Sequence, residues 1–530
     1  MRKWIPLIAV CLGTFMLLVD VTIVTVALPD MARRLDTTFT DLQWVMDLYA
    51  LALAALLLGA GSLADRVGQR RVYLVGLVVF TAASLACGLA GNAAELIAFR
   101  GVQGVGGAAM LATTVALISH LYQGRDRGTA FGVWGAVNGA AAAAGPILGG
   151  LLTQHLDWRW IFFVNLPIGM AALIMTVRVI PAYAPKPTLD ERLDVPGLAT
   201  FTIAAAAITF ALIKGNDYGW TSPRTITLFA GGAAALCIFI VVELRTKLPL
   251  LDLSLFRAPT FTGTMIGAML LSVAAFSYLA YSSLWLQSVL GMSPVTAGLC
   301  FLPMSIAAFI TASLAGRFLE HASPQWLIGG GLVMIGAGAL MQAAIGPTSS
   351  WPVLIPGLAV SGIGVGLSTP SLASTAVSAV GYQRAGMASG AVNTARQLGN
   401  ALGIALLGVV FHHALAASLS GPTASATANA LASGQSQSLL AQAATPTTPT
   451  TRATRATRAT RTTLTHQIHT AFANGLQSTF LVAGTVGLAA AIFALLLIRK
   501  PKPQPQPTSQ FDIPKDTPLQ RSLDSAVHEG

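Results

Sequence analysis

Runs of about 20 mainly apolar residues recur along this chain and limit what it can fold into. A helix of about 20 apolar residues crosses a bilayer core, and fourteen stretches meet that length. They are 7–29, 42–63, 73–93, 95–119, 128–152, 160–180, 196–214, 225–243, 260–286, 294–316, 326–345, 353–380, 390–413 and 477–498. Only 10% of the residues are charged, against about 25% in a soluble domain. The sequence therefore predicts an all-α polytopic membrane protein with fourteen transmembrane helices.

The positions of lysine and arginine predict the orientation. With the N-terminus inside, eighteen of these residues fall in inner segments close to a span, and five fall in short outer segments. Cytoplasmic loops carry the excess of positive charge in membrane proteins, so we expect both termini to be cytoplasmic in a multi-pass protein of the cell membrane. The net charge of +11 belongs mainly to interhelical loops and indicates no binding of nucleic acid.

Two segments read as unstructured. Residues 414–475 are rich in Ala, Ser and Thr and contain TRATRATRATRTT, whose period of three residues matches no helix face, so we expect a long disordered outer loop. The segment 501–530, which begins PKPQPQP, predicts an extended and disordered cytoplasmic tail.

Glycines repeat at a fixed offset and indicate an internal duplication. Six glycines of the first half recur 258 residues later. The first set is Gly104, Gly106, Gly128, Gly132, Gly145 and Gly150, and the second is Gly362, Gly364, Gly386, Gly390, Gly403 and Gly408. The match predicts two six-helix halves with two inserted helices, and membrane transporters often consist of such repeats with substrate bound between them. The predicted parts are 1–182, the inserted pair 183–257, and 258–500 before the tail.

A charged stretch between the second and third spans carries a family resemblance. Residues 61–76 read GSLADRVGQRRVYLVG, and its charges cannot lie in hydrocarbon, so we expect a tight loop at the membrane surface. It resembles the G-x-L-a-D-R-x-G-x-R-R signature of the major facilitator superfamily, although a topogenic loop of another polytopic protein is the alternative. The resemblance implies a conformational latch on the cytoplasmic side, made of Gly61, Asp65, Arg66, Gly68, Arg70 and Arg71.

The partner of Asp65 in this latch stays open. Gln69 stands where many members of the family carry a basic residue. The remaining candidates are Arg66, Arg70, Arg71, Arg100 and the N-terminus of a facing helix.

The first span has an acidic residue near its middle. Asp20 lies within LLVDVTIVTVALPDMA, and a charge there costs about 3 kcal/mol on insertion scales, so it is expected to face the bundle interior. The segment resembles the D-x-T-x-V-N-V-A-L-P signature of the fourteen-span drug:proton antiporter family, with Thr25 in place of the usual Asn. That resemblance implies proton coupling at Asp20. A structural hydrogen bond is the alternative.

Two further charged residues join this prediction. Arg100, Gln103 and Gly104 match the R-x-x-Q-G signature of the superfamily. Because a guanidinium stays protonated, Arg100 is expected to hold a neighbouring carboxylate charged, and a structural pairing with Glu95 or Asp20 is the alternative. Asp47, nearer the outer surface, is the second candidate proton carrier or a solvated residue. Spans 9 to 14 contain no acid.

The fifth span resembles an export signature. Its VNGAAAAAGPILGG matches the antiporter pattern G-P-x-x-G-G at Gly145, Pro146, Gly149 and Gly150, although small residues at these positions are also expected for ordinary close helix packing. The phrases DWRWIFFVNLPIG in span 6 and NTARQLGNALGIALLG in span 13 also resemble the fourteen-span family.

Together these patterns predict a proton-coupled antiporter that exports small amphipathic toxic compounds or antibiotics. The substrate is expected to be amphipathic or cationic, with Asp47, Tyr49, Gln103 and Asn138 as candidates for the substrate cavity. We expect a monomer in the lipid bilayer, driven by the proton gradient with no cofactor and no metal site, and no enzyme activity. A dedicated exporter of one endogenous metabolite is the alternative, and a membrane sensor that does not transport is a third.

Overall fold

The structure is entirely helical in the part of the chain it describes. A computed structural model covers residues 2–35, 37, 39–181, 194–246, 249–318, 322–380, 384–419, 431 and 451–499. Fourteen helical segments within these ranges are long and apolar enough to cross a membrane, which confirms the predicted fold class. The tail 501–530, and residues 420–430 and 432–450 of the expected outer loop, lie outside the described residues.

The first six spans follow one another without long connections. After a 3-10 turn η1 (Arg2–Trp4), they comprise α1 (Ile5–Arg34), α2 (Phe39–Val67), α3 (Gln69–Leu89), α4 (Ala93–Leu121), α5 (Gly124–His155) and the sixth span, made of α6 (Trp160–Phe163) and α7 (Asn165–Val179).

Local chemistry sets the ends of these helices. Asn92 accepts a hydrogen bond from the backbone N–H of Glu95, whose carboxylate accepts from the N–H of Gly91, so α4 begins in a reciprocal cap. Gly68 separates α2 from α3 with a φ of 103°, a backbone conformation that residues other than glycine rarely adopt. Lys3 pairs with Asp126 at 3.0 Å and ties the start of the chain to the start of α5. We call this end of the bundle the terminal side.

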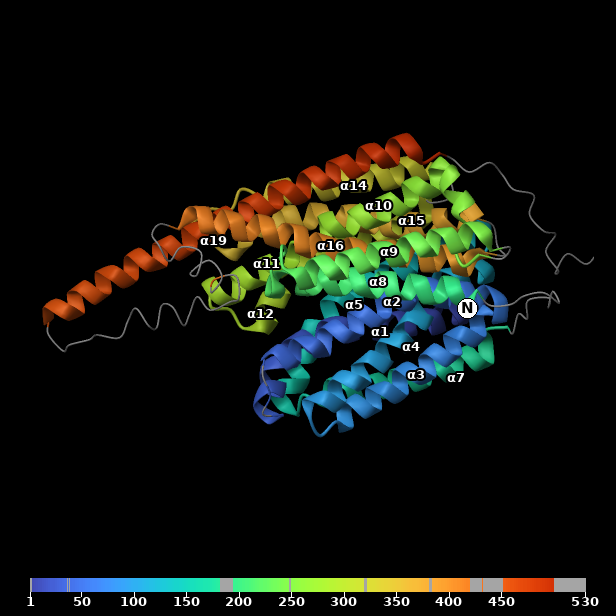
Figure 1. The fold of residues 1–530 in the computed structure, drawn as a ribbon, viewed down its shortest axis with the longest axis horizontal. Helices are drawn as coiled ribbons and strands as arrows, with labels where there is room; N and C mark the ends of the chain where they lie inside the picture. Colours follow the sequence, from blue (N-terminus) through green and yellow to red (C-terminus); the bar gives the residue numbers. More distant parts are fainter. Residues whose placement is uncertain are drawn as a thin grey trace, which may run out of the picture. The chain divides into compact units, whose positions relative to one another are not determined.

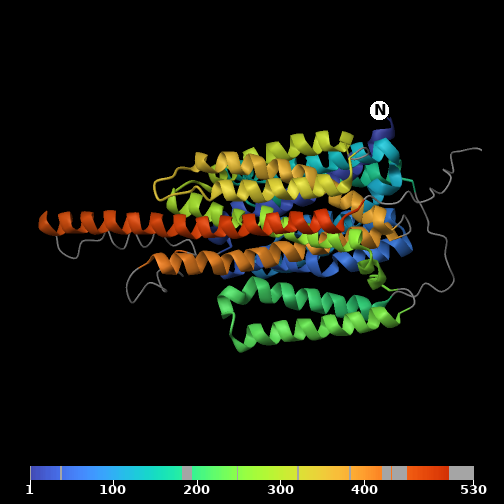
Figure 2. The same cartoon turned by 90° about the horizontal axis from the view of Figure 1, so that it is seen from above.

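Two inserted helices lie between the halves in sequence. They are α8 (Val195–Tyr218) and α9 (Pro223–Arg245). Ser222 caps α9 by accepting from the N–H of Thr225, with Pro223 in the first helical turn. Figure 2 shows α8 and α9 (green) as an antiparallel pair at one side of the bundle, and α8 packs against α2 and α16.

The second half contains the last six spans, several of them broken. Its elements are η2 (Leu253–Arg257), α10 (Pro259–Ala275), α11 (Leu279–Leu284), η3 (Trp285–Val289), α12 (Pro294–Leu299), α13 (Leu302–Phe318), α14 (Pro324–Gln342), η4 (Trp351–Leu354), α15 (Ile355–Val380), α16 (Ala385–Ser418) and α19 (Thr451–Leu497). The ninth span runs from α10 through α11 to η3, and the tenth combines α12 and α13.

The structure corrects part of the expected outer loop. Residues 451–475 were expected to be disordered, but α19 includes all of them, and α16 continues to Ser418. The reason lies in composition, because alanine and arginine favour helix and neither glycine nor proline occurs between Thr451 and Ala473. A three-residue repeat therefore forms a helix without presenting one polar face.

Packing between the halves follows the duplication. By the glycine offsets, span 2 corresponds to span 10 and span 5 to span 13. The two most extensive contacts between the halves are α2 with α16 and α5 with α13, the same pair of spans exchanged. Figure 1 shows helices of both halves running along a common direction. The contacts are those expected when two related halves face each other.

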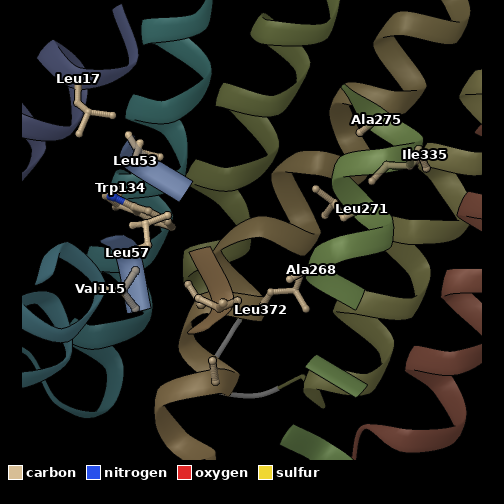
Figure 3. Packing of buried hydrophobic residues seen from close by; sticks show 14 of the residues in the cluster. Leu17, Leu53, Leu57, Val115, Trp134, Ala268, Leu271, Ala275, Ile335 and Leu372 are labelled. Carbon is tan, nitrogen blue, oxygen red and sulfur yellow. The ribbon is translucent and has the colours of Figure 1, made fainter. Parts of the chain in front are cut away.

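Apolar side chains from both halves meet in the middle of the bundle. Figure 3 shows Val115 and Trp134 of the first half on one side and Leu271 and Leu372 of the second half on the other. All four side chains are almost fully buried. The contact between the halves is therefore continuous with the apolar core of each half.

Candidate coupling site, latch and central cavity

Asp20 lies inside the first half and is bound by three side chains. One oxygen, Oδ2, lies 2.5 Å from Nη1 of Arg100, and the other, Oδ1, accepts from Nε2 of Gln103 at 2.8 Å and from Nδ2 of Asn165 at 2.9 Å. The residue is 0% exposed. A buried carboxylate is stable only when a countercharge and further hydrogen bonds compensate for lost hydration, and Asp20 has both.

Arg100 is compensated on its remaining sides. Its Nε donates to the carbonyl of Val45 at 3.1 Å, and its Nη1 also donates to Oε1 of Gln103 at 2.7 Å. The ring of Tyr49 lies 4.1 Å from the guanidinium carbon, a cation–π contact. Of the two partners considered for Arg100, the structure selects Asp20, since Glu95 binds backbone at the start of α4.

Two members of this network carried no predicted role. Ser84 of α3 accepts from Gln103 at 2.9 Å and from Asn165 at 3.3 Å. Asn165, at the start of α7, is 1% exposed. The sequence signal for Asn165 is an amide within the apolar run WIFFVNLPIG, because such a group needs a partner in the membrane. Nothing in the sequence indicated Ser84, since serine is common in these spans.

The network can act as a proton switch but is closed in this state. A proton on Asp20 would remove the countercharge of Arg100 and weaken three charge-assisted hydrogen bonds, each of them stronger than a neutral one. Because Asp20 and Arg100 are excluded from solvent, a proton reaches them only after the helices around them move.

Asp47 belongs to a different contact. Its Oδ2 lies 3.5 Å from Nζ of Lys214 on the inserted helix α8, and Lys214 also lies over the ring of Trp44 at 5.2 Å. The Lys214 side chain is 5% exposed and that of Asp47 is 21% exposed. The structure thus places Asp47 at the contact between α2 and α8 and does not bring it to Asp20.

Asp65 closes the terminal side by binding the start of α16. Its Oδ1 accepts from the N–H of Gly386 and its Oδ2 from the N–H of Met387, both at 2.7 Å. A carboxylate is favoured at a helix N-terminus by free N–H groups and by the helix dipole. Of the candidate partners for Asp65, the structure thus selects the facing helix. We call Asp65 with Gly386 and Met387 the latch.

Glycine and glutamine shape the latch. A Cβ on Gly61 would collide with the carbonyl of Gly386, so this glycine permits the close approach of α2 and α16. Gln69, at the position that departs from the family signature, donates to Oδ1 of Asp65 at 3.2 Å. The missing basic residue is therefore replaced by a neutral donor.

The basic residues of the predicted latch interact with groups other than Asp65. Arg70 donates to the carbonyl of Val177 at 2.7 Å, and Arg71 donates to the carbonyl of Val67 at 3.4 Å. Arg66, at the end of α2, acts electrostatically on Glu243 of α9. Arg70 and Arg71 thus hold the loop to its own half, Arg66 acts on an inserted helix, and the contact with the second half comes from Asp65.

Among the described residues, no carboxylate latches the duplicated crossing between α5 and α13. Gly316 stands at the position related to Asp65, as the offset of 251 residues predicts. A Cβ on Gly316 would lie 2.8 Å from the carbonyl oxygen of Gly128 and 2.9 Å from the Cα of Gly132. One crossing is thus held by a carboxylate, and its counterpart is a direct contact of backbones.

The antiporter signature lies where α5 meets two helices. A Cβ on Gly145 would collide with the hydroxyl of Thr22 on α1, and one on Gly150 with Val295 of α12. Pro146 packs against Gly298 of α12, where an added Cβ would lie 2.6 Å from the proline Cβ. The carbonyl of Gly149 accepts from Thr153 at 2.6 Å within α5. The signature therefore permits close packing of α5 on helices of both halves.

A small cavity lies between the halves. It is bordered by α4, α5, α10, α15 and α16, and its lining residues are Val115, Trp134, Leu271, Thr369, Leu372, Ala373, Val392, Asn393 and Arg396. Arg396 makes no hydrogen bond or ion pair within the described ranges. The cavity is therefore mainly apolar with one guanidinium and one amide, a pattern typical of small-molecule sites.

None of the four predicted cavity residues lines this cavity. Tyr49 and Gln103 belong to the Asp20 network, and Asp47 pairs with Lys214. Asn138 of α5 donates to the carbonyl of Trp134 on its own helix at 2.7 Å. In this state these polar side chains bind other residues of the bundle, and their role in a substrate cavity stays a prediction. No cluster of three potential metal ligands occurs among the residues the structure describes.

Comparison with known proteins agrees with this architecture. The Major Facilitator Superfamily profile matches residues 10–404. The Multidrug resistance protein Stp of Mycobacterium tuberculosis (strain CDC 1551 / Oshkosh) is 37% identical over 416 residues, covering 78% of this chain and 77% of that protein. The Tetracenomycin C resistance and export protein of Streptomyces glaucescens is 34% identical over 535 residues, covering 97% and 95%.

A third relative and a solved structure extend the comparison. The Methylenomycin A resistance protein of Streptomyces coelicolor is 37% identical over 409 residues, covering 77% of this chain and 86% of that protein. The crystal structure of the human organic anion transporter MFSD10 has a TM-score of 0.59 at 14% identity, covers 93% of this chain and 99% of its own, and shows the shared fold. From profile, relatives and fold together, the chain belongs to the Major Facilitator Superfamily and is a multi-pass membrane transporter of small molecules, not an enzyme.

Proposed function

We propose that the protein is a proton-coupled antiporter that exports small amphipathic toxic compounds or antibiotics. The observation that carries the coupling is the buried Asp20, held by Arg100, Gln103 and Asn165. The export of drugs is supported by relatives that are named for multidrug or antibiotic resistance.

The proposed cycle uses Asp20 as the proton carrier. When the site opens to the more acidic side, Asp20 takes a proton and Arg100 loses its countercharge, which changes how α1 and α4 pack. When it opens to the other side, Asp20 releases the proton and the pair forms again. One proton crossing 100 mV supplies about 2.3 kcal/mol, which sustains roughly a 50-fold gradient of a neutral substrate.

The central cavity supports an amphipathic substrate. Its walls are mainly apolar, and its polar groups are Thr369, Asn393 and Arg396. A guanidinium repels a cation, so we place neutral and anionic amphipathic compounds ahead of the cationic compounds expected from the sequence. No cofactor takes part in this scheme, and the proton gradient is the energy source.

We also propose that the terminal side is cytoplasmic, with both ends of the chain inside the cell. The charge count supports this orientation, because Arg66, Arg70 and Arg71 lie at that side. Protease added to intact spheroplasts is expected to cut between residues 420 and 450 and to spare the C-terminal tail. Cleavage of the tail under these conditions would reverse the orientation.

The test of transport uses purified protein in liposomes with an imposed pH gradient. A panel of labelled dyes and antibiotics of positive, neutral and negative charge is added to wild type and to Asp20→Asn. We expect uptake against a gradient in the wild type, with substrate-induced proton release, and neither in Asp20→Asn, which should retain substrate binding. Normal proton release by Asp20→Asn would refute the coupling. Transport of one compound alone would favour the dedicated exporter.

A further inference from the structure

Two acidic residues meet at the terminal side, where the inserted helices begin and end. Asp194 precedes α8, and its Oδ1 accepts from the N–H of Gly197 at 2.9 Å. Glu243 lies in the last turn of α9, and its Oε2 accepts from the N–H of Leu251 at 3.2 Å. Asp194 is 5% exposed and Glu243 is 4% exposed. Each carboxyl therefore has one oxygen satisfied by a backbone N–H.

The remaining two oxygens face the same point. Oδ2 of Asp194 and Oε1 of Glu243 are buried and have no hydrogen-bond partner. Both border Gly197, and a Cβ on this glycine would collide with Oδ2 and lie 2.8 Å from Oε1. Glycine at this position thus leaves room for both carboxyl oxygens beside the start of α8. Two unpaired carboxylates in such a place repel, and the pair binds a proton instead.

The surroundings indicate which carboxyl holds the proton. Asp194 caps α8, where the helix dipole and a backbone N–H stabilise a negative charge. Glu243 lies at the opposite, C-terminal end of α9, where the dipole disfavours that charge. The end of α9 is therefore the less favourable place for a negative charge, and a proton on Oε1 of Glu243 would give the unpartnered Oδ2 of Asp194 a donor. Among the described residues, Arg66 of α2 also acts on Glu243, and its positive charge favours the ionised form.

Glu243 also connects to the latch through a short chain of contacts. Leu251, whose N–H binds Glu243, precedes Asp252. The N–H of Asp252 donates to Sδ of Met387 at 3.5 Å, and its carboxylate pairs with Arg384. Arg384 directly precedes α16, and Met387 supplies one of the amides that bind Asp65. The segment 249–252 therefore links the carboxyl pair to the helix that the latch holds.

We propose that Asp194 and Glu243 form a second proton-binding site, which holds one proton while the terminal side is closed and favours opening when it is lost. Glu243 gives its proton to water, and the two adjacent carboxylates then repel each other. The repulsion displaces the end of α9 from the start of α8 and loosens segment 249–252, which frees the start of α16. The site is distinct from Asp20 and does not depend on the proposed substrate.

The first experiment detects the proton. Infrared difference spectra of the full-length protein in nanodiscs are recorded as the pH is raised, without substrate. The wild type is expected to lose a protonated-carboxyl band that is absent in Glu243→Gln and shifted in Asp194→Asn. Asp126→Asn is the matched control, a carboxylate at the same side that pairs with Lys3 and is 45% exposed. A wild-type band that persists in Glu243→Gln would overturn the assignment.

The second experiment detects opening. Spin labels at Gln123 and Ser323 of a cysteine-free chain report the distance between the halves at the terminal side. We expect the open fraction to rise with pH in the wild type and in Asp126→Asn, and to stay at its acidic value in Glu243→Gln, where the amide cannot ionise. An unchanged pH response in Glu243→Gln would overturn the proposal. Failure of all transport in liposomes with an intact pH response would instead refute the proposed function alone.

Discussion

The carboxylate of Asp20 and the guanidinium of Arg100 are 2.5 Å apart, and neither side chain is more than 2% exposed. They come from spans separated by 80 residues, and they bind each other inside one half rather than across the halves. Removing one partner of such a pair leaves a buried charge uncompensated, at a cost of about 3–5 kcal/mol. The residues that hold this pair in place are therefore as important as the pair itself.

Asn165→Leu is expected to weaken proton coupling. The variant removes the donor that binds Oδ1 of Asp20 at 2.9 Å, and a hydrogen bond to a charged group contributes about 1.5–3 kcal/mol. Less substrate-induced proton release is expected per protein, together with a lower melting temperature in detergent. Asn138→Leu is the control, since that amide donates to the carbonyl of Trp134 on its own helix. Equal proton release in the two variants would show that Asn165 is not part of the switch.

Asp65→Asn is expected to favour opening of the terminal side and to reduce export without reducing the amount of protein. An amide offers one accepting oxygen, whereas the carboxylate binds the N–H groups of both Gly386 and Met387. Loss of one charged hydrogen bond, about 1.5–3 kcal/mol, shifts the closed–open equilibrium by about tenfold or more.

Thiol labelling measures this shift. Ser389 of α16 is fully buried in the closed state, so Ser389→Cys in a cysteine-free chain should react slowly. The added Asp65→Asn change should raise the rate about tenfold, by the same free-energy difference. Asp126→Asn should leave the rate unchanged. A rate in Asp65→Asn equal to that of its parent would mean that the latch does not hold the closed state.

Gly316→Ala is expected to separate α13 from α5. Its Cβ would lie 2.8 Å from the carbonyl oxygen of Gly128 and 2.9 Å from the Cα of Gly132, and backbone atoms cannot yield by a rotamer change. Overpacking of this kind costs about 1–3 kcal/mol, so a lower melting temperature and slower export are expected. Gly330→Ala of α14 is the control, because a Cβ there meets no atom within 4 Å. Similar melting temperatures for both variants would contradict the close contact.

The fold could be predicted because membrane spans leave a local signal. Each needs only about 20 apolar residues, so the number of spans, the inserted pair and the duplication follow from the sequence. The start of α19 could not be placed in this way. The rule that predicts a span is hydrophobicity, and the helix beyond the span, from Thr451, depends on helix propensity instead.

The site was less predictable because it depends on which polar groups meet. Asp20 and Arg100 were expected to interact, and the facing helix was among the partners considered for Asp65. Asp47, Tyr49 and Gln103, expected in the substrate cavity, make contacts within the first half and with α8 that the sequence did not indicate. Spacing along one helix does not show which neighbour a side chain meets across the bundle, and so Ser84 and Asn165 were missed.

The contact between Asp252 and Arg384 is expected to depend on pH in the acid range. Burial opposes ionisation of Asp252, but hydrogen bonds from Ser254 and Arg384 outweigh it, so the pKa of this carboxyl lies below its ordinary value of 3.8. Because the pKa is lowered, the carboxylate of Asp252 contributes its full stabilisation at any pH above its ordinary pKa. This stabilisation is lost as the pH falls through the lowered pKa of the folded protein.

Hydrogen exchange of residues 249–257 measures this dependence. Because the pKa of Asp252 is lowered, its contribution to protection of this segment should be constant between pH 7 and 5. Below about pH 4 the wild type should lose protection, and Asp252→Asn should not show this loss. The proposed deprotonation of Glu243 loosens the same segment at higher pH, so the two effects have opposite signs. Loss of protection on acidification in Asp252→Asn equal to that of the wild type would assign the effect to another group.

Lys214 is expected to attach the inserted helices to the first half. Its ammonium pairs with Asp47 of α2 at 3.5 Å and lies over the ring of Trp44. Lys214→Met leaves a carboxylate without this cation, and because Asp47 is 21% exposed, the expected loss is about 1–3 kcal/mol, below that of a fully buried pair. A lower melting temperature is expected in Lys214→Met and in Asp47→Asn.

The double variant Asp47→Asn/Lys214→Met decides between attachment and proton coupling. If the pair serves attachment, the losses of the two single variants should not add, because the second change removes a charge that the first left unpaired. Substrate-induced proton release should then equal that of the wild type in all three variants, since Asp20 keeps its partners. If Asp47 carries a proton, substrate-induced proton release should fall in Asp47→Asn and in the double variant, which both lack this acid. Lys214→Met should then release protons as the wild type does. Proton release from reconstituted protein, measured beside the melting temperatures, therefore separates the two roles of the same carboxylate.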